Sequence, residues 1–230
     1  MYKLLAIWQT LCRAGVLSLV CLACLPAAYG ETREALFKAA EVDDESSIVS
    51  MALKGLNIGT QDEQGQSALM IAAREGSMKV ARFLMAQPVV KINALNLKGE
   101  SALMLASLKG RLELVRELIA NKAEVNKPGW TPLHYAASNP EPVSHDVVAM
   151  LLENYAYIDA ESPNRTTPLM MAAHYGHADV VKLLLEEGAD PGLRNEQGLT
   201  AVDFARGAGR KEQAELIASF MRAKPGAGRW

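Results

Sequence analysis

The feature that most constrains the fold of this 230-residue sequence is a short phrase that recurs at a nearly fixed interval. The phrase is Ser or Thr, then Ala or Pro, then an aliphatic residue, and its copies begin at Ser67, Ser101, Thr131, Thr167 and Thr200. Leu36 extends the series backwards by about one more period. A period of about 33 residues is typical of stacked supersecondary units, which contact only their neighbours and present extended binding surfaces. We therefore expect one elongated domain.

The copy at 167–190 shows most clearly how one unit folds. Thr167 is placed to cap a first helix, and Pro168 suits its first turn, where a missing amide hydrogen costs nothing. Gly176 is expected to end that helix in the left-handed conformation. A second helix is predicted over about 178–187, because aliphatic residues recur there at helical spacing. The sequence thus predicts a chain of helix–turn–helix units.

This unit resembles the ankyrin repeat in its Thr-Pro-Leu start, its paired alanines, its Gly-His turn and its aliphatic second helix. The resemblance covers about residues 33–221. It implies an all-α ankyrin-repeat solenoid of about six helix–turn–helix repeats with short hairpin tips. The predicted repeats are about 33–61, 62–95, 96–126, 127–161, 162–194 and 195–221, within a domain at 31–222 that is followed by a flexible tail at 223–230.

Several units depart from this pattern. The first carries a polar run at 43–47, and the last has Asp203 in place of the expected His, which suits solvent-facing caps at the two ends of the array. The connection at 126–129 is shortened, so we expect a stunted hairpin tip there. Extra residues at 140–144 separate the two helices of the fourth unit. They either help to recognise a partner or reflect neutral drift in a tolerant loop.

Residues 1–30 have the order of a secretory signal peptide, with positive Lys3 and Arg13, an apolar core, and small residues up to Gly30. The uninterrupted apolar stretch is shorter than the roughly 20 residues of a membrane-spanning helix. We therefore expect cleavage after Gly30 and no membrane span in the mature chain. Two alternatives stay open: the leader is retained as an anchor, or the chain is lipidated at Cys24.

The cysteines and the charges narrow the compartment and the partner. All three cysteines lie in the leader, so the mature chain is expected to have neither a disulfide nor a cysteine metal site. This composition suits an oxidising compartment, and we predict a periplasmic or secreted protein. The 24 basic and 26 acidic residues nearly balance and form no basic block, which argues against nucleic acid as a partner.

The histidines are the candidates for chemistry in the array. His134 stands at the Thr-Pro-Leu-His position, where the resemblance implies a hydrogen-bonding strut. His174 and His177, with Asp179 nearby, have a spacing that permits a metal or small-ligand site, which we keep as an alternative. Because the zinc-protease, nucleophile-elbow and phosphate-loop motifs are all missing from the sequence, we predict no enzymatic activity and no cofactor.

The candidate binding residues come from the resemblance. It implies a concave face lined by the residue before each capping Ser or Thr and by the two residues before the Gly that follows each first helix. The candidates on this face are Trp130, Tyr175, Leu108, Lys109, His174 and Arg74. Exposed Trp and Tyr are enriched in binding hot spots, although local packing of Trp130 over the shortened tip is an equal alternative.

We therefore predict an exported ankyrin-repeat module that binds another protein through its concave groove. Regulation or stabilisation of a periplasmic protein is one form of this role. The alternatives are a metal- or small-ligand-binding protein that uses His174 and His177, and a membrane-anchored structural module.

Overall fold

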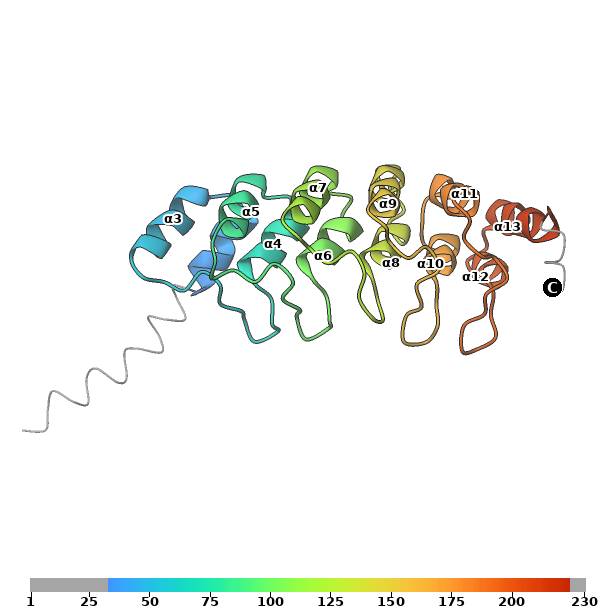
Figure 1. Ribbon diagram of the computed structural model, residues 1–230, viewed down its shortest axis with the longest axis horizontal. Helices are drawn as coiled ribbons and strands as arrows, with labels where there is room; N and C mark the ends of the chain where they lie inside the picture. The colour runs from blue at the N-terminus through green and yellow to red at the C-terminus, as the bar shows by residue number, and fades with distance from the viewer. Residues whose placement is uncertain (1–32, 224–230) are drawn as a thin grey trace, which may run out of the picture.

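The computed structural model describes residues 33–223, which fold into two parallel rows of helices with loops that project from one side (Figure 1). The predicted leader at 1–30 and nearly all of the predicted tail lie outside these residues. The inner row, nearest the projecting loops, comprises α4 (Ala68–Glu75), α6 (Ala102–Leu108), α8 (Pro132–Ala137), α10 (Pro168–His174) and α12 (Ala201–Gly207). The outer row comprises α3 (Glu45–Leu53), α5 (Met78–Met85), α7 (Leu112–Ala120), α9 (Ser144–Glu153), α11 (Ala178–Glu186) and α13 (Lys211–Ala223).

A further helix at 33–41 pairs with α3 at the amino-terminal end. Each inner helix is followed directly by its outer partner, so the chain climbs the stack one pair at a time (Figure 1). The predicted all-α solenoid is confirmed. Within residues 33–223, none of the helices is long and apolar enough to cross a membrane.

The recurring Ser or Thr begins each inner helix for the reason that the sequence suggests. The Ser101 hydroxyl accepts a hydrogen bond from the Met104 amide at 3.3 Å, and the Met104 sulfur accepts one in return from the Ser101 amide. In the last repeat Asp203 stands where Met104 stands in the third, and its carboxylate accepts hydrogen bonds from both the amide and the hydroxyl of Thr200. These reciprocal bonds satisfy amides that have no partner inside the helix. The two bonds from Thr200 also hold the pKa of Asp203 below its usual value.

Glycines end the inner helices in two different ways. Gly76 lies in the left-handed region with φ of 89°, as expected at a helix end. The expectation for Gly176 is wrong, because Gly176 is not left-handed. A Cβ there would collide with the carbonyl oxygen of Ala137 in the preceding repeat. Gly176 is therefore required by the close approach of two repeats and not by its own backbone angle.

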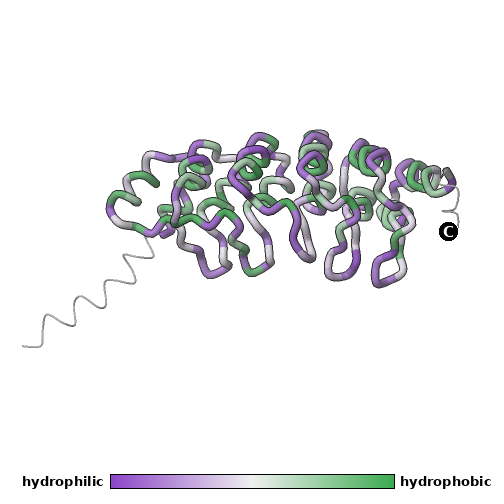
Figure 2. Tube along the Cα trace, in the orientation of Figure 1, coloured by the Kyte–Doolittle hydropathy of each residue, from purple (hydrophilic) through white to green (hydrophobic). Residues whose placement is uncertain are grey.

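One hydrophobic core runs through the stack from Leu36 to Ile217. Paired alanines such as Ala172 and Ala173 are fully buried and let neighbouring inner helices approach closely. The outer helices bury a single stripe each, as their spacing predicts. The hydrophobic stretches lie mainly in the two helix rows, and the projecting loops are mostly hydrophilic or neutral (Figure 2).

The projecting loops are hairpins closed by backbone hydrogen bonds, for example Asp62 amide to Gln66 carbonyl and Asn195 amide to Leu199 carbonyl. Neighbouring tips are also bonded to each other, at Leu97 to Gln64 and at Glu196 to Asn164. Within the described chain, the connection at 126–130 has no counterpart of either bond. It ends short of the flanking tips (Figure 1), so the expectation of a stunted tip is confirmed.

The polar run at 43–47 of the first unit does more than face solvent. Asp44 caps α3, because its carboxylate accepts from the Ser47 amide and from the hydroxyls of Ser46 and Ser47. These bonds lower the pKa of Asp44 to about 2. The Asp43 carboxylate accepts from the Val80 amide at 3.0 Å, in the first turn of the next outer helix. The first unit therefore supplies a cap to the second.

Candidate protein-binding surface

The candidate surface runs along the carboxyl ends of the inner helices and the hairpin residues that precede them. Its members lie on successive repeats, because they stand at the carboxyl ends of successive inner helices or just before a capping hydroxyl. Charges dominate it at the amino-terminal end, and aromatic rings dominate it at the carboxyl-terminal end. The inner helices and the projecting hairpins form its two sides (Figure 1).

Arg74 is held in place at the amino-terminal end. Its guanidinium donates to the Glu75 carboxylate at 2.7 Å and to the Gln66 side chain at 3.1 Å, and so links the end of α4 to the base of its hairpin. The Arg111 side chain from the next repeat donates to the Arg74 carbonyl at 3.4 Å. Arg74 thus offers a partner a charge that is held in position and already paired with a carboxylate.

Leu108 and Lys109 end α6 in the third repeat. Leu108 is partly buried, whereas the Lys109 side chain is exposed. Lys109 therefore contributes a flexible positive charge and little fixed geometry.

A hydrogen bond between repeats holds the middle of the surface. The Tyr135 hydroxyl donates to the Glu100 carboxylate at 3.1 Å, and the Asn96 amide donates to the same carboxylate at 2.7 Å. Burial and the nearby Glu100 charge together raise the pKa of Tyr135 above its usual value. The sequence prediction missed Tyr135, because its partner lies 35 residues earlier in another repeat.

Trp130 and His134 form the aromatic centre. The two rings meet edge to face, with 5.2 Å between their centroids. Trp130 is only partly buried by this contact, so it packs locally and still presents surface to solvent. Its backbone carbonyl accepts a hydrogen bond from the Lys127 ammonium at 3.0 Å, which holds the Trp130 main chain to the shortened connection.

His134 is a buried strut, as the resemblance implies. Its Nδ1 accepts from the Thr131 amide at 3.2 Å, which leaves Nε2 to donate to the Thr166 carbonyl at 2.9 Å in the next repeat. Burial lowers the pKa of His134 to about 4. The neutral imidazole therefore joins two repeats and has no free nitrogen for other chemistry.

Three rings gather at the carboxyl-terminal end. His174 meets Tyr175 edge to face with 4.2 Å between centroids, and Phe204 of the next repeat meets His174 edge to face at 6.2 Å. The Tyr175 side chain is 53% exposed. Trp130 and Tyr175 thus lie on consecutive repeats, each fixed by a neighbouring ring and each open to solvent.

The histidines of the metal alternative have other roles. His174 belongs to the ring cluster, while the His177 Nδ1 accepts from the Asp179 amide at 3.3 Å at the start of α11. Among residues 33–223, the structure shows no group of three or more His, Cys, Asp or Glu side chains able to hold a metal ion. The geometry therefore offers this alternative no support.

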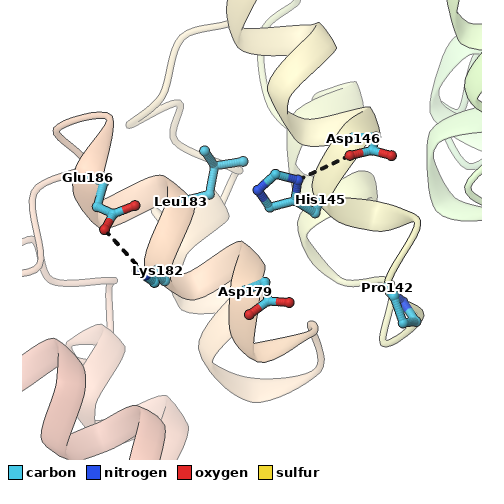
Figure 3. Close-up of a pocket in the computed structure, with 7 residues that line it drawn as sticks. All are labelled: Pro142, His145, Asp146, Asp179, Lys182, Leu183 and Glu186. Carbon is cyan, nitrogen blue, oxygen red and sulfur yellow. Dashed lines mark hydrogen bonds and ion pairs between the residues drawn. The ribbon is translucent and has the colours of Figure 1, made fainter.

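A polar cleft of about 340 Å³ lies between the outer helices α9 and α11 (Figure 3). The residues that line it are Pro142, His145, Asp146, Asp179, Lys182, Leu183 and Glu186. Its polar groups pair along their own helices, His145 with Asp146 at 3.2 Å and Lys182 with Glu186 at 3.8 Å. The side chains do not converge on one point, so the cleft has the character of a solvated helix surface.

The inserted loop of the fourth repeat borders this cleft through Pro142. Part of the loop is structural, because Val143 lies over Gly110 of the third repeat and the Asn139 carbonyl accepts from the His177 amide of the fifth. Pro140, Glu141 and Pro142 are exposed. The loop therefore packs on both neighbours and leaves only its apex for other contacts.

Comparison with protein families gives two matches. The family described as "Ankyrin repeats (3 copies)" matches residues 36–128 and 89–162, and the family described as "Ankyrin repeats (many copies)" matches residues 151–205. Together they extend over most of the described chain.

Among curated proteins, the chain is similar to the nuclear factor NF-kappa-B p105 subunit of Gallus gallus, with 31% identity over 172 residues. That alignment covers 71% of this chain and 17% of the relative. The chain is also 40% identical over 82 residues to ankyrin repeat and SAM domain-containing protein 6 of Mus musculus, covering 35% of this chain and 9% of the relative. It thus spans less than a fifth of the length of these relatives.

A solved structure is similar over nearly its whole length. The structure is titled Bd0816 predatory endopeptidase from Bdellovibrio bacteriovorus in complex with immunity protein Bd3460. The matched chain has 29% identity and a TM-score of 0.67, with 80% of this chain and 97% of that chain covered.

Proposed function

Because this chain belongs to the ankyrin-repeat family, we propose that it is an exported protein-binding module that acts through its concave surface and performs no chemistry of its own. Ankyrin repeats imply interaction with another protein. The described surface agrees with that role, because its histidines are engaged in packing and capping and its aromatic residues are fixed and partly open. Export rests on the leader-like order of residues 1–30.

The partner that we propose is an exported endopeptidase, which the module restrains or stabilises by covering part of its surface. The support is the similar solved structure, a complex between an endopeptidase and an immunity protein. The similarity extends over 97% of the matched chain, so it concerns the whole array and not one repeat. A regulator of an exported hydrolase must itself be exported to reach it. The lack of cysteines after residue 30 suits such an oxidising compartment.

The observation that carries this proposal is the pair of supported aromatic residues on consecutive repeats. Trp130 is braced by His134, and Tyr175 is braced by His174. A rigid aromatic side chain loses little conformational freedom on binding and buries a large area, which is why Tyr and Trp dominate hot spots.

The test is direct binding of the full chain to each purified exported endopeptidase of the organism that encodes it. We expect one enzyme to bind, and Tyr175→Ala to weaken that binding by roughly thirtyfold, the range of a hot-spot residue. Leu53→Ala is the matched control, because Leu53 is 84% exposed at the end of α3 in the outer row. If the wild type, Tyr175→Ala and Leu53→Ala all bind with equal affinity, the concave surface is not the binding surface.

Export is tested separately on the full sequence. Mass spectrometry of the amino terminus after expression and fractionation is expected to show a chain that begins after Gly30 in the exported fraction. A chain that keeps residues 1–30 would instead support the anchored structural module, and a lipid-modified fragment that starts at Cys24 would support lipidation. Recovery of the intact chain only inside the cell would contradict the proposed compartment.

A further inference from the structure

Tyr155, directly after α9, has a backbone conformation that its side chain does not favour. Its φ is 63°, in the left-handed region. Gly55 and Gly188 follow their outer helices with φ of 89° and 102°, where glycine carries no steric cost. A bulky residue at such an angle is an outlier. The Tyr155 side chain is also 85% exposed, so burial does not offset the strain.

A side-chain clamp from the preceding repeat holds the strained segment. The Asn126 amide group donates to the Tyr155 carbonyl at 2.7 Å, and its oxygen accepts from the Tyr157 amide at 2.9 Å. The Tyr157 side chain is 69% exposed. Two tyrosines are therefore presented to solvent from one fixed stretch of backbone.

The repeat before provides an internal comparison. There Asn93 makes the same two bonds, to the Lys122 carbonyl at 3.1 Å and from the Glu124 amide at 2.9 Å. Lys122 also lies in the left-handed region, with φ of 68°. The clamp is therefore shared by both repeats. They differ in the clamped residues, which are Lys122 and Glu124 in the third repeat and Tyr155 and Tyr157 in the fourth.

The turn itself serves the fold, because the Tyr155 amide donates to the Leu152 carbonyl and the Ala156 amide donates to the Leu151 carbonyl. A tyrosine where other repeats have glycine adds strain that this turn does not need, which points to function.

A cavity of about 400 Å³ lies beside Tyr157. It is lined by Asn126, Lys127, Pro128, Gly129, Tyr157, Ala160 and Glu161. The shortened connection forms one wall of it, and residues 157–161, which lead into the hairpin at 162–166, form the other. Its volume falls within the range of ligand pockets.

The charges of this cavity already have partners. The Lys127 ammonium donates to the carbonyls of Pro128 and Trp130, and Glu161 pairs with Arg165 at 3.1 Å. The other lining residues include Pro128, Gly129, Ala160 and Tyr157, so a charged side chain entering the cavity would lose its hydration beside largely apolar walls, next to an ammonium and a carboxylate that already have hydrogen-bond partners. An uncharged group is complementary to it. Tyrosine and proline side chains on the walls favour a proline, as in grooves that bind proline-rich segments.

We propose that a loop of the protein bound on the concave surface crosses the hairpin row at the shortened connection and inserts an uncharged, proline-bearing apex between Pro128 and Tyr157. The same loop reaches Tyr155 past Asn126, which lines the cavity and donates to the Tyr155 carbonyl. This proposal rests on the proposed function, because it concerns the same partner. The two contact regions are continuous, since Pro128 and Gly129 line the cavity and Trp130 follows them in the chain.

The sharpest test separates stability from affinity. Tyr155→Gly removes the left-handed strain, so its unfolding midpoint is expected to rise by about 2–4 °C. Its affinity for the endopeptidase is expected to fall by roughly tenfold, as is that of Tyr157→Ser. Lys122→Gly is the matched control, with the same gain in midpoint and unchanged affinity. A merely structural Tyr155 would change the midpoint alone.

The chemistry of the apex is tested with octaproline as the probe, by nuclear magnetic resonance of the full chain. We expect shifts in the signals of Asn126 and Tyr157, and their loss in Tyr157→Ser. If an endopeptidase binds but the tyrosine variants bind it like the wild type, the inserted loop is wrong and the proposed function stands. If no endopeptidase binds, the proposed partner is wrong, and octaproline alone decides: shifts support the cavity, and unchanged spectra overturn it.

Discussion

The fourth repeat, at 127–161, and the fifth, at 162–194, fold on the same frame but differ at nearly every place where the frame allows a choice. The fifth closes a full hairpin, caps its inner helix with Met170 and ends its outer helix at Gly188. The fourth has a shortened connection, His134 at the capping position and Tyr155 in place of the glycine. The regular repeat shows what stacking requires. The irregular one shows what stacking tolerates, and it carries two of the exposed tyrosines, Tyr155 and Tyr157.

The largest expected difference between the two repeats is in pH dependence. His134 has a pKa of about 4 in the fold because it is buried, whereas an unfolded histidine titrates near 6.5. Between these values the unfolded chain holds a proton that the folded chain does not, so stability is lost as pH falls from about 6.5 to about 4. The full loss is about 3 kcal/mol.

Chemical unfolding at several pH values measures this loss. His134→Met gives the fourth repeat the capping residue of the fifth, and we expect it to flatten the curve between pH 6.5 and 4 relative to the wild type. The carboxylates titrate equally in both proteins, so the difference between the curves isolates His134. Parallel curves would mean that the imidazole is not a buried neutral strut.

The next effect concerns the boundary where the two repeats meet. Gly176→Ala places a methyl group against the Ala137 carbonyl and forces the repeats apart, at an expected cost of about 2 kcal/mol in unfolding free energy. Gly207→Ala is the control, because a Cβ there meets nothing within 4 Å and alanine favours a helix. Denaturant titration should therefore shift the two midpoints in opposite directions.

The origin of each feature explains how far the sequence predicts it. The capping hydroxyls and the apolar stripes depend on residues three or four apart, so one repeat is enough to find them. The roles of Asp43, Gly176 and Tyr135 depend on atoms in another repeat, and sequence spacing does not place those atoms. The cavity beside Tyr157 is harder still, because it arises from a shortened connection and its neighbour together. Tyr155 did leave a signal in the sequence, since it stands where Gly188 stands one repeat later.

A smaller effect tests whether the fourth repeat shares its frame with the third. Asn126→Ala and Asn93→Ala each remove the two clamp bonds at one boundary. We expect each to cost about 1–2 kcal/mol in unfolding free energy, measured side by side by denaturant titration. Only Asn126→Ala should also weaken partner binding, because only that clamp carries tyrosines. A much larger stability loss at Asn126 would show that the tyrosines themselves help to hold the fold.

The smallest expected effect concerns the hydrogen bond between Tyr135 and Glu100. Tyr135→Phe keeps the ring and removes the hydroxyl, so the loss should be about 0.5–1 kcal/mol, because the bond is only partly shielded from water. Met171 occupies the same register in the fifth repeat, and Tyr135→Met completes the conversion. If the unfolding free energies of the two variants lie within about 0.5 kcal/mol of each other, methionine fills the space of the Tyr135 ring as well as phenylalanine does. The ring then contributes packing and the hydroxyl contributes one weak hydrogen bond. A much larger loss in Tyr135→Phe would mean that Glu100 needs the tyrosine as its partner, and that the concave surface is organised by polar links between repeats as much as by its aromatic residues.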